Sequence, residues 1–404
     1  MSKPLNNMVA VMAEYGYGID SMMPAFPGKS VDYITDVQRD NNNALSRPVI
    51  GNGLLGVHPC KTSYFNISAQ GFRLPGFEQP WPPRADRKTV FVFGGSTMVG
   101  YYIEDKDTIP AIMGKRLGDH GIDVYNMGGG NYTSRSDLLY FLLLIDQGIK
   151  PDIAVFLDGL NDCFYAFGNP TLIGLLDSLY QSEKRRRGLS YAAAVWDYAV
   201  SSFHERRRPL PNGANFSKAI ETDMVRDLFS REGVERALAM SASKIPLRDI
   251  DPALQSVAAD VWSRYLDTVE MIRGLTRRHE IETYFAWQPV PYFMTRPDQR
   301  IMERIYPAFS SIAMSSPVYN WLHAMDFPSL KTDPDFLDLS TLGNDLDGVS
   351  YVDICHYSPA MSTLIANRLA DWLMQASSIR KDDRVSDWSA GADAPAPKIR
   401  ELRN

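Results

Sequence analysis

Cysteine is scarce in this 404-residue sequence, which has only Cys60, Cys163 and Cys355. Three scattered cysteines do not form a disulfide framework, and they lack the paired spacing of a zinc site. An odd number of cysteines is more typical of a reducing compartment than of an oxidising one. We therefore expect a cytoplasmic protein.

Long apolar runs and strong charge of one sign are also missing. No stretch of about 18 residues is continuously apolar, so no membrane span is predicted. The first 28 residues contain one lysine and no unbroken apolar segment, which does not resemble a signal peptide. The formal net charge of -6 gives no field that would attract nucleic acid. What remains is the composition of a folded globular protein, with 45% hydrophobic and 22% charged residues.

Short apolar runs alternate with amphipathic stretches over much of the chain. Runs bounded by charged or turn residues predict buried strands at 89–93, 122–125, 153–157 and 283–287. Amphipathic stretches predict helices from Asp107, as N-cap, to Met113, and from Thr133 or Ser134 to Ile145. A last helix is expected to begin at Pro359. This alternation favours a doubly wound α/β fold with a parallel sheet.

Composition also suggests how the chain is divided. Residues 1–85 are rich in Pro, Gly and Asn, and we expect an irregular arm that packs on the core. Segments 86–168 and 275–376 carry the strand and helix pattern of the α/β core. Between them, 169–274 is helical in pattern and predicts a helical insertion or cap. The charged, Ala- and Pro-rich segment 377–404 is expected to be a disordered tail.

Four polar segments follow predicted strands or precede the last helix: 94–97, 126–134, 158–162 and 353–356. Open α/β sheets bind ligands at the carboxyl ends of their strands. Each segment alone has a simpler explanation, such as a capping serine, a loose glycine loop, a common turn or a metal-binding pair. A dinucleotide fingerprint is absent after the first strand. Met98 also stands where the G-x-S-x-G elbow of α/β-hydrolases has its last glycine.

The side chains in these segments suit acyl transfer. Ser96, in Gly-Gly-Ser-Thr, follows a buried strand and can present its hydroxyl at the edge of the sheet. Asn161 follows the third strand, where its amide can reach an oxyanion. Asp353 and His356 lie three residues apart, so the carboxylate can hydrogen bond to the imidazole and fix its tautomer.

In this order the segments resemble the SGNH hydrolase superfamily, the GDSL-like esterases and lipases. The resemblance covers about 88–168 and 283–375, and 159–162 matches the family's G-x-N-D segment in full. It implies a flavodoxin-like doubly wound sheet with a helical insertion, which is the SGNH hydrolase fold. It also implies Ser96 as nucleophile, His356 as general base and Asp353 as its orienter. The oxyanion donors would be the Ser96 N–H and the Asn161 amide.

One segment departs from the family pattern N-x-G-x-x-G-x-[ST]. Aligning Asn126, Gly128 and Thr133 puts Asn131 where the family has its second glycine, whose N–H donates to the oxyanion. Either Asn131 donates instead, since Asn tolerates left-handed backbone, or Gly130 does so in a shifted turn.

The resemblance implies a serine-dependent esterase that acts through an acyl-enzyme and needs no metal or organic cofactor. The substrate would be a small-molecule or glycan ester, with an acyl or acetyl group on a carbohydrate, lipid or small metabolite. One alternative is an O-acyltransferase with the same triad. Another is an inactive binding protein on the SGNH fold. The sequence leaves the oligomeric state open.

Overall fold

The centre of the structure is a parallel sheet of five strands. The computed structural model describes residues 18–45, 48–51, 54–164, 252–294, 318–319, 322, 330 and 332–376. Its strands are β3 (Lys88–Gly94), β4 (Ile122–Asn126), β5 (Ile153–Asp158), β6 (Glu282–Trp287) and β7 (Phe336–Asp338). They lie in the order β4-β3-β5-β6-β7, and every neighbouring pair is parallel. Counted from β3 this is the 2-1-3-4-5 order of flavodoxin-like folds, which confirms the predicted fold class.

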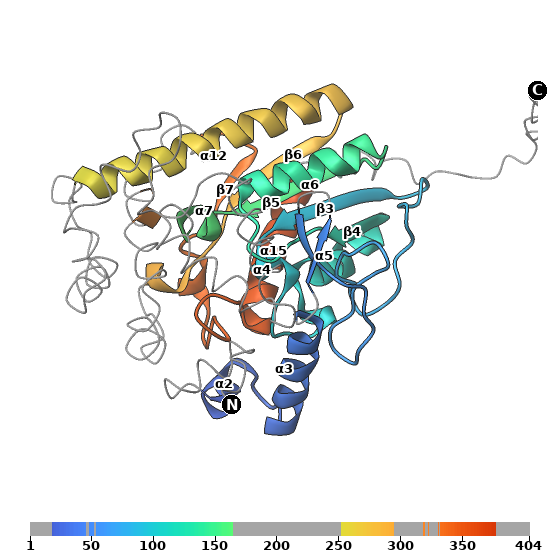
Figure 1. The fold of residues 1–404 in the computed structure, drawn as a ribbon, viewed down its shortest axis with the longest axis vertical. Helices are drawn as coiled ribbons and strands as arrows, with labels where there is room; N and C mark the ends of the chain where they lie inside the picture. The colour runs from blue at the N-terminus through green and yellow to red at the C-terminus, as the bar shows by residue number, and fades with distance from the viewer. Residues whose placement is uncertain are drawn as a thin grey trace, which may run out of the picture.

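Helices cover both faces of this sheet (Figure 1). On one face, α6 (Ser134–Asp146) packs against β3 and β5, and α12 (Pro252–His279) packs against α6 and β6. On the other, α5 (Ile109–Leu117) lies against β4 and contacts α15 (Pro359–Ala376). This three-layer arrangement buries both faces of the strands, as their unbroken apolar sequences predict.

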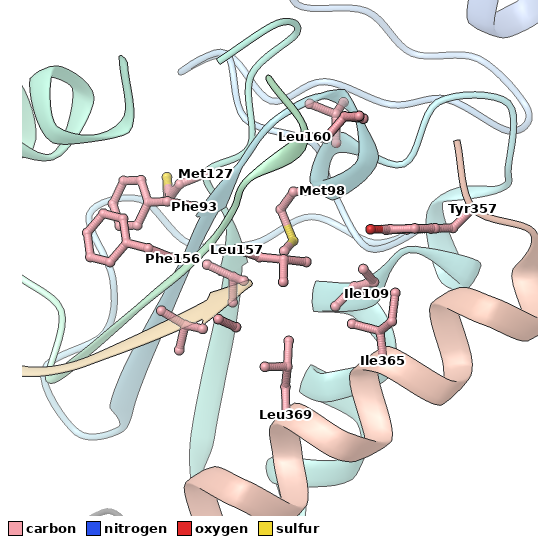
Figure 2. Packing of buried hydrophobic residues seen from close by; sticks show 14 of the residues in the cluster. Phe93, Met98, Ile109, Met127, Phe156, Leu157, Leu160, Tyr357, Ile365 and Leu369 are labelled. Atoms are coloured by element: carbon pink, nitrogen blue, oxygen red, sulfur yellow. The ribbon is translucent and has the colours of Figure 1, made fainter. Parts of the chain in front are cut away.

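The core runs through the sheet and the helices on either side. Phe93 of β3 and Phe156 of β5 stack with their ring centroids 4.8 Å apart. Figure 2 shows Ile365 and Leu369 of α15 facing the sheet from below, with Ile365 close to Ile109. All five side chains are buried almost completely. Ile365 and Leu369 therefore belong to the face by which the last helix packs on the core.

Helix starts follow the expected chemistry, with one correction. Asp107 does not cap α5, because it belongs to the 3-10 turn Asp105–Asp107. Thr108 is the N-cap: its backbone is extended, and its hydroxyl accepts the N–H of Ala111 at 3.4 Å. For α15, Pro359 occupies the first helical position, as predicted.

The N-terminal segment 1–85 is less irregular than its composition predicts. It contains α2 (Ile19–Met22), the 15-residue helix α3 (Val31–Leu45) and a hairpin of β1 (Pro48–Gly51) and β2 (Leu54–Val57). Phe65, Ile67 and Phe72 are buried in the core cluster. Shorter helices complete the described chain: α4 (Ser96–Val99), α7 (Leu160–Phe164), and the 3-10 helices Met23–Ala25, Asp105–Asp107, Gly118–His120, Pro291–Phe293 and Leu342–Asp345.

Most of the predicted insertion and the whole predicted tail lie outside the described residues. Of the segment 169–274 only the part from Pro252 is described, and there α12 is helical as the pattern predicts. Since α12 continues to His279, the boundary expected near 275 falls inside a helix. The division into domains stays a prediction. No helix in the described ranges combines the length and apolar character that a membrane span requires.

Candidate active site

Ser96 lies where the chain leaves β3, at the reversal of strand order. β4 is on one side of β3 and β5 is on the other, which is the crevice where open α/β sheets bind ligands. β3 ends at Gly94, Gly95 caps the four-residue helix α4, and Ser96 is its first residue. The side chain of Ser96 is partly exposed, whereas the three residues after it are buried. The short helix thus presents one hydroxyl at the end of the sheet.

The structure brings Ser96 together with the distant pair Asp353 and His356. Ser96 Oγ lies 2.9 Å from His356 Nε2, and His356 Nδ1 lies 2.6 Å from Asp353 Oδ2. The other carboxylate oxygen, Oδ1, accepts the backbone N–H of Cys355 at 2.9 Å and of His356 at 2.7 Å. One carboxylate therefore fixes both the turn and the ring, which explains the three-residue spacing. This is the hydrogen-bond pattern of a Ser-His-Asp triad.

Burial and charge shift the pKa values of Asp353 and His356 in opposite directions. For Asp353, burial raises the pKa, but the opposite charge of His356 and three hydrogen bonds outweigh it and hold the pKa below its usual value. For His356, burial lowers the pKa, but the Asp353 charge and hydrogen bond outweigh it and raise the pKa well above its usual value. Asp353 thus stays ionised and makes the imidazole a stronger base.

Two tyrosines pack against the imidazole of His356. The rings of Tyr101 and Tyr102 each have their centroid 5.3 Å from that of His356. Both tyrosines are buried, and Tyr102 has a left-handed backbone with φ of 67°. Its N–H donates to Asn41 Oδ1 at 3.1 Å, so α3 supports this residue from the N-terminal segment. The two tyrosines form the wall on which the imidazole rests.

Asn161, at the start of α7, lies beside the turn that leads into Ser96. Its Nδ2 donates one proton to the carbonyl of Tyr132 at 2.8 Å. A side chain at Gly95 would put its Cβ 2.5 Å from this same nitrogen, so only glycine lets Asn161 approach so closely. The amide carries a second proton, which is the donor that the sequence predicts for an oxyanion.

The segment after β4 curls over α4. Asn126 donates from Nδ2 to the Met98 carbonyl at 2.9 Å and accepts the Gly128 N–H at 3.0 Å. Gly129 donates its N–H to the Gly94 carbonyl at 2.9 Å. Asn131 has a left-handed backbone with φ of 62°, the conformation for which glycine is the usual residue. Asn131 is therefore in the left-handed conformation that the sequence leaves open for an asparagine at this position.

Two further residues support the site, and the sequence did not single them out. Asp162 accepts the hydroxyl of Ser134 at 2.6 Å and the N–H of Gly159 at 3.3 Å, which ties the segment after β5 to the start of α6. Gln288, after β6, donates to the Tyr357 hydroxyl at 3.1 Å and to Thr97 at 3.4 Å. Asp162 is the last residue of the segment 159–162, whose pattern assigned it no role, and Gln288 could have been indicated only by its position directly after β6.

The described residues contain one cluster with metal-binding atoms from three side chains, namely Asp353, Cys355 and His356. Two of these three already bind each other, as described above. A cavity of about 440 Å³ is lined by the 128–130 loop, the N-terminal segment and α6. Its lining includes Trp81, Tyr132, Tyr140 and Leu144.

Comparisons with known proteins add little to this geometry. No protein-family model and no curated protein matches the sequence. Among solved structures, a protein assigned to the G-D-S-L family of lipolytic proteins from Desulfitobacterium hafniense DCB-2 is 10% identical, with a TM-score of 0.33 over 71% of this chain and 100% of its own. An alpha/beta hydrolase enzyme from the metagenome of Lake Arreo, Spain, is 12% identical, with a TM-score of 0.29 over 72% and 96%. A mutant of the esterase AlinE4 is 19% identical, with a TM-score of 0.20 over 40% and 99%.

Proposed function

We propose that this chain is a serine-dependent ester hydrolase of the SGNH type, with Ser96 as nucleophile. The observation that carries the proposal is the chain of hydrogen bonds from Ser96 Oγ through both nitrogens of His356 to Asp353. A serine is a weak nucleophile unless an adjacent base takes its proton. These three side chains come from two segments more than 250 residues apart in sequence. An inactive binding protein would have no need for this arrangement.

In the first step, Ser96 Oγ attacks the ester carbonyl carbon while its proton moves to His356 Nε2. The C–O bond to the alcohol then breaks, and the alcohol oxygen takes that proton from Nε2 as it leaves. Asp353 stays ionised and stabilises the imidazolium between these two transfers. The product of this step is an acyl group bound to Ser96 Oγ.

The negative oxygen formed in this step needs donors. We assign them to the Ser96 N–H, the second proton of the Asn161 amide and the N–H of Asn131. Support for Asn131 over Gly130 is its left-handed backbone at the position where the family pattern has glycine. Loss of one such donor costs roughly 100- to 1000-fold in kcat.

In the second step, water attacks the acyl carbon, gives its proton to His356 Nε2, and the Ser96 hydroxyl is restored. An alcohol in place of water would make the same site an O-acyltransferase. Supplying candidate alcohols with the ester and measuring the new ester against the free acid distinguishes the two. A cytoplasmic location and a substrate among carbohydrate, lipid or small-metabolite esters remain part of the proposal.

The test is Ser96→Ala, assayed on a short p-nitrophenyl ester and on labelling by a fluorophosphonate probe. We expect both hydrolysis and labelling to be lost, with the melting temperature unchanged within a few degrees. Ser358→Ala is the matched control, because Ser358 is a buried serine whose hydroxyl caps α15. A Ser96→Ala protein that hydrolyses the ester at the wild-type rate would refute the nucleophile assignment.

A further inference from the structure

A buried arginine from the N-terminal segment is bonded to the chain that follows the nucleophile. The side chain of Arg73 is 1% exposed and pairs with Asp105 at 2.8 Å. A guanidinium has five N–H groups, and here five acceptors meet them. The acceptors are Asp105 Oδ1 at 2.8 Å, the carbonyls of Val99 at 3.2 Å, Tyr64 at 3.1 Å and Ile103 at 2.7 Å, and the carbonyl of Gly100.

Three of these acceptors belong to the segment 99–103, which needs an external anchor. The helix α4, which carries Ser96, has four residues, too few to be stable by itself. Its last carbonyls have no partner within a helix of that length, and Arg73 Nη1 binds those of Val99 and Gly100. The chain then turns sharply at Gly100, which has φ of 80°. Arg73 therefore holds the turn at which the nucleophile's helix ends.

The same segment carries the two tyrosines that pack on His356. Tyr101 and Tyr102 lie between Gly100 and Ile103, and Arg73 binds the carbonyls of both flanking residues. A shift of this segment would move the wall behind the imidazole and the helix that presents Ser96. The distance between Ser96 Oγ and His356 Nε2 depends on both.

The ion pair is itself supported from the N-terminal segment. Asp105 accepts the backbone N–H of Asn66 at 3.0 Å and its Nδ2 at 2.5 Å. The ring of Phe65 lies 3.9 Å from the guanidinium carbon. Arg73 and Asp105 thus satisfy each other's charge while both side chains are almost completely buried.

From this arrangement we propose that Arg73 is a positioning residue for the reaction: its guanidinium fixes segment 99–103, and thereby the geometry of Ser96 and His356. The inference rests on the proposed function. It also gives the N-terminal segment a catalytic purpose, since Arg73 reaches the site from outside the α/β core.

The test compares Arg73→Lys with the matched control Arg87→Lys. Arg87 also pairs with an aspartate, Asp123, at 2.8 Å and binds two carbonyls, but these lie at the amino end of β4, away from the site. A lysine keeps the charge and loses the fork of donors. Since a misplacement of about 1 Å can cost on the order of 100-fold, we expect Arg73→Lys to lower kcat 10- to 100-fold on p-nitrophenyl acetate. KM should change less than about threefold, because ground-state binding is retained.

Both variants are assayed at a temperature at which circular dichroism shows them folded. Arg87→Lys should keep kcat within about twofold even if it lowers the melting temperature as much as Arg73→Lys does. Equal effects of the two variants on kcat would overturn the inference, as would an unchanged kcat in Arg73→Lys. If Arg73→Lys does not fold, Asn66→Ser decides: it loosens Asp105 without touching Arg73, and should lower kcat in the same direction but less. An unchanged kcat in folded Asn66→Ser then counts against the inference.

Ser96→Ala is measured alongside, so that two failures can be told apart. If Ser96→Ala keeps activity, the proposed nucleophile is wrong, whatever Arg73→Lys does. If Ser96→Ala is inactive and folded Arg73→Lys equals the wild type in kcat, only the positioning role of Arg73 is wrong.

Discussion

A single methyl group at Gly95 should disable the proposed oxyanion site by displacing the Asn161 amide, without replacing any catalytic residue. The backbone of Gly95, with φ of -76° and ψ of -160°, is one that alanine adopts readily. The new Cβ would, however, lie 2.5 Å from Asn161 Nδ2 and 3.3 Å from the Tyr132 carbonyl. Because unbonded heavy atoms settle near 3.5 Å, the amide of Asn161 must move by about 1 Å.

A displacement of that size removes the donor from an oxyanion. We expect Gly95→Ala to lower kcat by roughly 100- to 1000-fold, or about 2.7–4 kcal/mol in transition-state stabilisation. The assay is steady-state hydrolysis of a p-nitrophenyl ester. Gly114→Ala is the control, because its Cβ would meet Val124 Cβ at an ordinary 3.6 Å within α5. That variant should keep kcat and gain up to about 1 kcal/mol of stability.

A double variant shows whether Gly95 acts through Asn161. Asn161→Ala alone should lower kcat by a similar factor, since it removes the same donor. Adding Gly95→Ala to it should then cost less than about threefold more, because the effects of residues in direct contact are not additive. If the two losses instead multiply, the methyl group acts elsewhere and the reasoning is refuted.

Other parts of the site and core yield further measurable expectations. Since the pKa of His356 is raised and the base must be neutral, the acid limb of kcat/KM should lie above the pH of an ordinary imidazole. Asp353→Asn removes the charge that raises the pKa of His356, so the acid side of the pH profile of kcat/KM should move to lower pH while kcat falls about 10⁴-fold. An acid side that stays in place would contradict the pairing of Asp353 with His356. Asn131→Gly should keep kcat and Asn131→Val should lower it, because glycine adopts φ of 62° freely whereas a β-branched residue is strained there; equal rates would contradict the left-handed turn. Leu369→Ala should cost roughly 2.7–5 kcal/mol in urea unfolding. The exposed control Leu142→Ala should stay within about 0.5 kcal/mol, and similar losses for both would contradict the packing of α15.

The sheet could be predicted from the sequence because its strands are unbroken apolar runs. The strand predicted at 89–93 is Lys88–Gly94, and that at 153–157 is Ile153–Asp158. β7, Phe336–Asp338, was missed because three residues give no pattern to recognise. α3 was missed because its sequence, rich in Asn and Asp, has weak helix propensity and is stabilised by packing. The sequence predicts Asp107 as the N-cap of α5, whereas Thr108, one residue later, has the required extended backbone.

The candidate site was predictable where one local pattern carries both chemistry and geometry. In Asp353-Ile-Cys-His356 the carboxylate holds the turn and the ring at once, and the three-residue spacing made this contact possible, although the same spacing also suited a metal-binding pair. The contact between His356 and Ser96 could be expected only because the carboxyl ends of parallel strands lie at the same edge of a sheet. At the segment after β4, Asn126 to Ser134, the sequence left two donors open. There the left-handed backbone of Asn131 now favours one of them.

Arg73 could not have been found in this way, because its role exists only through distant contacts. Its neighbours in sequence, Phe72 and Leu74, are buried like ordinary core residues, and an arginine between them suggests only a surface position. Its role becomes visible from the five hydrogen-bond acceptors of its guanidinium, four of which lie 26 to 32 residues later in the chain. A buried charge is costly unless it is fully paired, so a guanidinium at this place implies that the pairing segment is fixed. The segment so fixed is the one that ends the helix carrying Ser96 and packs on His356, and this is the reason for proposing Arg73 as a positioning residue.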